Sequence, residues 1–205
     1  MDGFRTIEPK ILYFGTPVAL ISSLNEDGGT NLAPISSFWA LGWTFVLGLL
    51  DETKTADNLA RLRECVINIP SPEMWQNVEK LAPLTGKNPV PELKTHQFHF
   101  EPDKFGVSEL TPMPSELVQP ERVRECPVHL ESRVVHLHTL SGEKLNKLGG
   151  AVAAEVEVLR VHVAENFVVG DHHIDPEKWS PLIYNFRHYF RLADKELGKT
   201  FRAEK

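Results

Sequence analysis

The sequence predicts a mainly β fold, an antiparallel barrel with a few helices. About seven apolar segments have the length and composition of strands, and most follow one another directly along the chain. Only two or three stretches show helical periodicity, and strands do not alternate with helices as in a doubly wound sheet. The GxGxxG fingerprint of a dinucleotide-binding domain is absent.

Size and composition limit the functional classes. The chain has 205 residues, enough for a single domain over residues 1–205. Its 41% hydrophobic content and net charge of −6 argue against a disordered chain and against a broad nucleic-acid-binding surface. The first ten residues lack the apolar core of a signal peptide, and two cysteines are too few for a disulfide framework. We therefore expect a cytoplasmic protein with neither a nucleic-acid nor a membrane partner.

The first half of the chain begins with strand-like segments. Residues 11–24 predict two short strands or one long bent strand, and Asp27-Gly28 favours a hairpin turn after them. Residues 28–50 form a charge-free stretch of 23 residues, long enough to cross a bilayer. Because Asn31, Pro34 and Gly42 interrupt a helix or add polar groups, we interpret this stretch as a buried β region that ends in a strand over 44–50.

Helical periodicity appears next, and strands return later. Residues 53–65 and 72–81 predict two helices, with a short strand over 66–69 between them. Two long strands are predicted over 126–140 and 151–163, with a helical turn at 141–148. In the second long strand the apolar positions change face between Val158 and Leu159, which indicates a β-bulge or a barrel corner. An aromatic tail over 175–198 predicts a short helix.

Residues 83–121 are the least regular part of the chain. They are rich in proline and show weak periodicity. A connection of this length is too long for a simple loop. We expect a surface excursion with short elements of its own, either a lid or a partner-facing insertion.

Two segments combine small polar residues with buried or helix-starting positions. Residues 31–39 place Ser36 and Ser37 in an apolar region, where unpaired hydroxyls would cost free energy. Residues 51–58 lie where a strand ends and a helix begins, so backbone N–H groups, Lys54 and Thr55 could bind an anion. The structural alternative remains open for each: strand neighbours could satisfy the serines, and Thr53 or Thr55 could simply cap the helix.

Five stretches carry a resemblance to a known family. They are TPVALISSLNEDGGTNLAPISSFWALGW, KTADNLARLRECVINIPSP, RVRECPVHLESRV, EVEVLRVHV and IDPEKWSPLIYNFRHYFRL. Together they resemble the flavin reductase-like family of FMN-binding split barrels, over most of residues 11–71 and 122–198. The resemblance implies a six-stranded antiparallel split β-barrel with Greek-key-like connections. It also implies a homodimer that holds FMN in a groove at the subunit interface.

The resemblance also implies which residues contact FMN. Those lining the isoalloxazine and ribityl chain would be Asn31, Ala33, Ser36, Ser37 and Phe38. Those holding the phosphate would be Lys54, Thr55 and Asn58. His162 would lie near the cofactor groove, and His188 and Tyr189 would reach the flavin or nicotinamide of the partner chain.

The chemistry implied is hydride transfer from NADH or NADPH to the flavin, with no catalytic side chain because the cofactor performs the reaction. A flavin-using monooxygenase could then take the reduced flavin. The first alternative is an FMN-binding electron carrier or flavin sensor without reductase turnover.

A metal-dependent cupin-type enzyme is the second alternative. His136-Leu137-His138 followed by Glu143 partly resembles the cupin motif. Leu130 stands where that motif requires glycine, and residues 141–148 have the pattern of a helical turn. We therefore predict no metal ligands.

Overall fold

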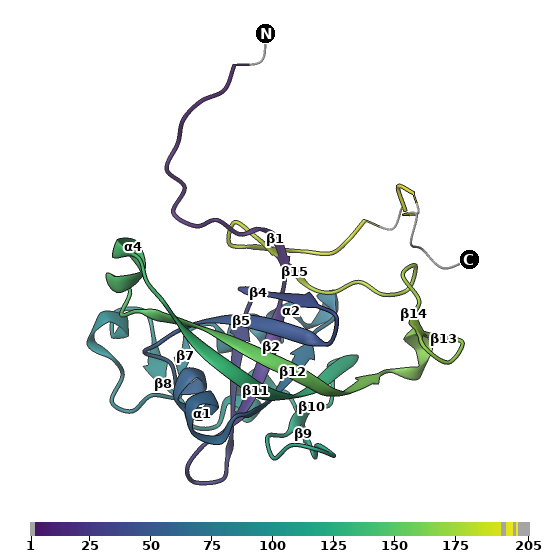
Figure 1. Cartoon of the computed structure of the whole chain (residues 1–205), viewed down its shortest axis with the longest axis horizontal. Coiled ribbons are helices and arrows are strands. Elements are labelled where there is room, and N and C mark those ends of the chain that lie inside the picture. The colour runs from purple at the N-terminus through teal and green to yellow at the C-terminus, as the bar shows by residue number, and fades with distance from the viewer. Residues whose placement is uncertain (1–2, 194–195, 199, 201–205) are drawn as a thin grey trace.

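A seven-stranded antiparallel sheet forms the centre of the molecule (Figure 1). The structure, a computed structural model, describes residues 3–193, 196–198 and 200. In spatial order the strands are β3 (Thr30–Ile35), β2 (Ala19–Leu24), β6 (Glu64–Ile69), β11 (Val128–Leu140), β12 (Ala151–Val163), β5 (Thr44–Leu50) and β4 (Phe38–Leu41). The predicted mainly β fold is confirmed. The resemblance implied six strands, and the main sheet has seven in the order given.

The two outermost strands of this sheet are consecutive in sequence. β3 and β4 are separated only by Ser36 and Ser37, yet they pair with different neighbours, β2 and β5. The chain therefore passes from one end of the strand order to the other within two residues. The predicted site residues are therefore divided between the two end strands: Asn31 and Ala33 lie on β3, and Phe38 lies on β4.

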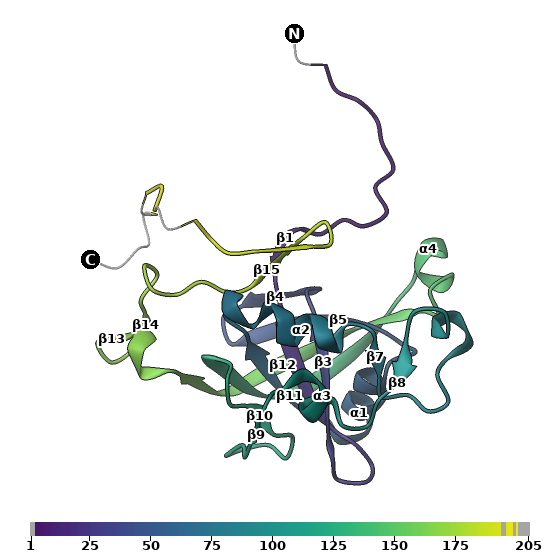
Figure 2. The ribbon, with the colours of Figure 1, turned by 180° about the vertical axis from the view of Figure 1, so that it is seen from behind.

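The main sheet packs two apolar clusters on its opposite faces. Alternation along β2 sends Ala19 and Ile21 into the first cluster and Leu20 into the second. The first cluster includes Leu59 from α1 (Lys54–Leu62). Helix α2 (Trp75–Leu81), which follows the short helix η1 (Pro72–Met74), contributes to the second cluster and lies over the sheet in Figure 2. Both helices were predicted.

The change of face predicted in β12 is a β-bulge. In the β11–β12 ladder, Glu131 pairs with Arg160 and Ser132 pairs with Val158, so Leu159 is the extra residue. A second extra residue, Val135, lies on β11. Each bulge moves the following side chains to the other face and increases the local twist, which helps a sheet curve.

The tail folds differently from the prediction. Within its described residues 175–193 and 196–198 there is no helix. Instead β15 (Ile183–Asn185) and β16 (His188–Phe190) form a hairpin that pairs with β1 (Phe14–Pro17). Its turn residues, Phe186 and Arg187, have φ of 45° and 69°. Two consecutive positive φ angles are those of a tight hairpin turn, and this sequence lacks the usual Asn-Gly signal for it.

The remaining short elements complete the chain. Helix α4 (Glu143–Asn146) is the predicted turn between β11 and β12. After β12 come η3 (Glu165–Phe167) and the small hairpin of β13 (Val168–Val169) and β14 (His173–Ile174).

The proline-rich segment is only in part a surface excursion. It contains β7 (Leu84–Thr85), η2 (Glu92–Lys94), β8 (His99–Phe100), α3 (Lys104–Ser108) and β9 (Pro112–Met113), which pairs with β10 (Arg122–Val123). Leu84, Phe105 and Leu110 belong to the second apolar cluster. Because these side chains are buried, the segment contributes to the core and is more than a removable lid.

The charge-free stretch 28–50 forms three strands, and no helix among the described residues is long and apolar enough to span a membrane. The expectation that the whole stretch is buried is wrong for its middle. Trp39, Leu41 and Trp43, around β4, are 58%, 76% and 63% exposed. β4 is the end strand of the sheet, so only one of its edges is paired.

Candidate functional site

A polar cleft of about 410 Å³ lies at the start of α1. It is lined by the turn after β2, the first turn of α1 and two parts of the proline-rich segment. The lining residues used below are Glu26, Asn31, Lys54, Asp57, Gly86 and Lys87.

The start of α1 is set by a capping residue. Thr53 has an extended backbone, and its hydroxyl accepts a hydrogen bond from the Ala56 N–H at 3.2 Å. The capping alternative is therefore correct for Thr53. Thr55, two residues after Thr53, is buried, and its hydroxyl accepts a hydrogen bond from the Asn31 side-chain amide at 3.1 Å. Lys54, in this first turn, lines the cleft, and the N-terminus of a helix favours a bound anion. The cleft is also lined by the carboxylates of Glu26, Asp27, Asp57 and Glu101, which oppose one.

Two lysines of this cleft are paired with carboxylates. The Lys54 ammonium forms an ion pair with Glu26, which lies in the turn after β2. This pairing lowers the pKa of the Glu26 carboxyl. Lys87, from the proline-rich segment, pairs with Asp57 of α1 at 2.5 Å. An anionic ligand would compete with Glu26 for the Lys54 ammonium.

Behind the cleft lies a buried polar network. Asn31, only 3% exposed, accepts a hydrogen bond on Oδ1 from Lys104 Nζ at 2.9 Å. Because an ammonium can only donate, this contact orients the amide so that Nδ2 faces Thr55 and Ser23. Asn58 donates to the same Ser23 hydroxyl at 3.1 Å. The predicted residues Asn31, Thr55 and Asn58 are therefore brought together through side chains of β2, β3, α1 and α3.

Lys104 is a buried cation with no carboxylate partner among the ion pairs of the described residues. It is 4% exposed, and Asn31 is its hydrogen-bond acceptor. Burial lowers the pKa of Lys104 to about 8, an effect that the negative charge of Glu101 partly opposes. This ammonium therefore carries its charge at neutral pH within a poorly hydrated site.

Ser36, Ser37 and Phe38 occupy the other end of β3. Ser37 donates to the Gly48 carbonyl at 2.7 Å, so a strand neighbour satisfies this hydroxyl. Phe38 stacks on Phe45 of β5, with ring centroids 6.1 Å apart. These residues do not line the cleft at α1. At about 3.3 Å per residue, β3 separates Asn31 from Ser36 by roughly 17 Å, with Ala33 midway and half-buried.

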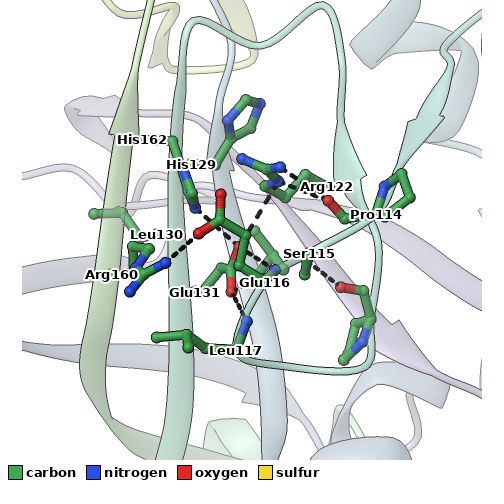
Figure 3. Close-up of polar contacts among 12 residues, drawn as sticks. Pro114, Ser115, Glu116, Leu117, Arg122, His129, Leu130, Glu131, Arg160 and His162 are labelled. Atoms are coloured by element: carbon green, nitrogen blue, oxygen red, sulfur yellow. Dashed lines mark hydrogen bonds and ion pairs between the residues drawn. The ribbon is translucent and has the colours of Figure 1, made fainter.

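His162 lies in a separate polar cluster around the buried Glu131, shown in Figure 3. Its Nε2 donates to the Glu131 carboxylate at 2.9 Å. Glu131 is fully buried and also accepts from the Glu116 and Leu117 N–H groups at 2.9 and 2.6 Å. Burial alone would raise the pKa of Glu131, but these hydrogen bonds and the charge of His162 outweigh it and lower the pKa. The carboxylate holds the end of the proline-rich segment against β11 and β12.

His188 and Tyr189 line a second cleft, of about 660 Å³, next to Trp75 of α2. The Tyr189 hydroxyl donates to Glu79 at 3.0 Å. Burial, reinforced by this contact, raises the pKa of the phenol. None of the residues lining this cleft lines the cleft at α1. Their proposed contact with the flavin of a partner chain stays a prediction.

The cupin-like residues do not converge. His138 contacts Glu155 at 3.1 Å, and Glu143 instead pairs with Lys147 at 2.9 Å. Among the described residues, no group of three or more His, Cys, Asp or Glu side chains could hold a metal ion.

Several residues of the site were not predicted. Glu26 directly precedes the predicted Asp27-Gly28 turn and was given no role at the site. Gly86 and Lys104 lie in the proline-rich segment, where the periodicity is weak. No sequence signal marks Lys104, because its position beside Asn31 depends on how α3 docks against β3. Glu131 could have been singled out, since a charge within an apolar strand is rarely buried without partners.

Comparisons with known proteins agree with this architecture. The family described as "Flavin reductase like domain" matches residues 11–193. YdfE of Bacillus subtilis (strain 168), described as uncharacterized, is 45% identical over 202 residues, which cover 98% of this chain and 95% of that protein. Flavoredoxin of Desulfovibrio vulgaris (Miyazaki F) has a TM-score of 0.78 at 22% identity, covering 99% of this chain and 100% of that one. An FMN-binding protein from Thermus thermophilus has a TM-score of 0.72 at 14% identity, covering 97% and 100%.

Proposed function

The chain belongs to the flavin reductase-like family, and from this premise we propose that it binds FMN and transfers hydride to it from NADH or NADPH. The observation that carries the proposal is the cleft at α1. There a helix N-terminus, Lys54 and the Asn31–Thr55 pair supply hydrogen-bond donors of the kind that a phosphate requires.

The donor set fits the phosphate end of FMN. Lys54 would pair with the phosphate in place of Glu26, and the N–H groups of the first turn of α1 would donate to its oxygens. Asn31 would hold the Thr55 hydroxyl in position. When bound, FMN supplies the hydride-accepting N5 position and performs the redox chemistry. The protein would bind, orient and shield it.

The ring end would lie toward Ser36, at the far end of β3. The half-buried side chain of Ser36 makes no hydrogen bond to another described residue, so its hydroxyl could bind a ligand. An extended molecule lying along β3 could reach both ends of the strand. We propose on the same basis that the isoalloxazine contacts Ala33, Ser36, Ser37 and Phe38.

A homodimer is part of the proposal. Trp39, Leu41 and Trp43 expose a large apolar surface at an end strand, next to the proposed ring end. A second copy of the chain could cover this surface and close the flavin groove.

The decisive experiment is a spectrum of the purified protein followed by turnover. We expect absorbance near ~450 nm from bound flavin, or its appearance on adding FMN, and NADH or NADPH oxidation that depends on FMN. FMN binding without oxidation of either nicotinamide would instead support the electron-carrier or sensor alternative. A protein that binds no FMN would overturn the proposal.

A further inference from the structure

We propose that Lys104 is a positioning residue for the phosphate of the bound flavin, acting through Asn31. The inference rests on the proposed function and assigns a role to the proline-rich segment, which lies outside the five stretches that carry the resemblance in the sequence. Lys104 is the first residue of α3, within that segment.

The first support is its unusual environment. Fully burying an ammonium without a carboxylate partner is costly, and buried charges are normally paired. Lys104 is 4% exposed, and its described acceptor is the neutral Oδ1 of Asn31 at 2.9 Å. Two of its three N–H donors therefore lack an acceptor among the described residues. Glu101, a carboxylate that lines the cleft, offsets part of this charge without forming an ion pair with Lys104. An anion bound in the cleft would compensate the remainder.

The second support is the position of Asn31. Its side chain lines the cleft at α1 together with Lys54 and Gly86, while Lys104 contacts it from behind. Lys104 thus places positive charge one side chain away from the proposed phosphate. In addition, it fixes the Asn31 amide so that Nδ2 donates to Thr55 Oγ1. Thr55 is buried and does not itself line the cleft, so this contact fixes how Asn31 is presented to a ligand.

The third support is the tight docking of the segment. A Cβ atom on Gly86 would lie 2.6 Å from Asn31 Oδ1 and 3.0 Å from Lys54 Cβ. The proline-rich segment therefore contacts both Asn31 and Lys54 at Gly86. Its backbone at Gly86 and its side chain at Lys104 hold Asn31 from two directions.

The test compares FMN with riboflavin, which lacks the phosphate. We expect Lys104→Met to weaken FMN binding about three- to tenfold while riboflavin binding changes less than about twofold. Ser108→Ala is the matched control, since it removes the hydrogen bond from Ser108 to the Lys104 carbonyl without changing charge. That variant should keep the wild-type FMN-to-riboflavin ratio. An unchanged ratio in Lys104→Met, or an equal fall for both ligands, would overturn the inference.

A second measurement needs no variant. The FMN-to-riboflavin affinity ratio of the wild-type protein should fall as pH rises from about 7.5 to 9.5, a range in which the phosphate, with a second pKa of about 6, stays dianionic. The charged groups on the elements around Lys104 include Glu101, the N-cap Asp103 and Glu79 of α2. They also include three ion pairs, Lys54–Glu26, Lys87–Asp57 and Lys80–Glu109. A constant ratio would contradict the role of Lys104. Failure of the wild-type protein to bind FMN at any pH would instead contradict the proposed function.

Discussion

Gly86 and Asn31 are so close that no side chain fits between them: a Cβ at position 86 would lie 2.6 Å from Asn31 Oδ1. We predict that Gly86→Ala destabilises the protein by about 1–3 kcal/mol, because Asn31 is held by hydrogen bonds and cannot move aside. Urea unfolding measures this change. Gly142→Ala is the control, since its Cβ would meet Leu145 only at 4.0 Å. Equal stability of the two variants would contradict the prediction.

Lys54 and Glu26 should affect FMN affinity in opposite directions. Lys54→Met removes a partly buried cation that lines the cleft and should weaken FMN binding roughly 10- to 100-fold. Glu26→Gln frees the ammonium from its ion pair and should strengthen it. Thr55→Ala should weaken FMN binding too, by removing the hydroxyl that Asn31 orients. Isothermal titration with FMN and riboflavin checks all three, and unchanged affinity in Lys54→Met and Thr55→Ala would place the phosphate elsewhere.

Lys104 should make stability increase in alkaline solution. Its pKa is lowered by burial to about 8 in the folded protein, against 10.5 for an ordinary lysine. Between pH 8 and pH 10.5 the unfolded chain binds more protons at this lysine than the folded protein does. The contribution of Lys104 to the free energy of unfolding therefore rises with pH, by up to about 3 kcal/mol. We predict that Lys104→Met is more stable than the wild-type protein near pH 7 and that the difference shrinks toward pH 10. A constant difference across this range would show that Lys104 does not titrate as described.

Glu131 should have the opposite pH dependence. Its pKa is lowered in the folded protein, so its contribution to stability is present at neutral pH and is lost as pH falls through the carboxyl range. Glu131→Gln should cost about 1.5–3 kcal/mol at pH 7, since it removes a charged acceptor of the Glu116 and Leu117 N–H groups. The variant should also lose stability less steeply on acidification. Glu116→Gln, which breaks an exposed ion pair with Arg160, should change stability by less than about 1 kcal/mol.

The apolar surface around β4 should control assembly. If a second copy covers Trp39, Leu41 and Trp43, sedimentation equilibrium will show a dimer. Leu41→Glu should convert this dimer to a monomer and weaken FMN binding, because a charge would be buried at the interface. Leu93→Glu is the control, as an exposed leucine elsewhere on the surface. A monomeric wild-type protein would contradict the predicted homodimer.

Local patterns were sufficient where a residue's neighbours in sequence decide its structure. The strands over 44–50 and 151–163, the helices that begin near 54 and 72, and the bulge at Leu159 all follow from apolar periodicity and from capping residues. The tail was predicted wrongly because its hairpin turn uses Phe186 and Arg187 at positive φ, without the residues that usually mark such a turn.

The candidate site divides in the same way. Lys54 and Thr55 could be named in advance, because the N-terminus of a helix has a local signature. Asn31 and Asn58 were named through the family resemblance. Lys104, Gly86 and Glu26 could not, since each acquires its role from a contact across the fold. Thus the sequence alone determined the strand and helix pattern outside the tail and the proline-rich segment, and the cation at the start of α1. Only the tertiary structure decided which buried charge lies behind that cleft and which carboxylate competes within it, because long-range docking, and not local preference, places those side chains.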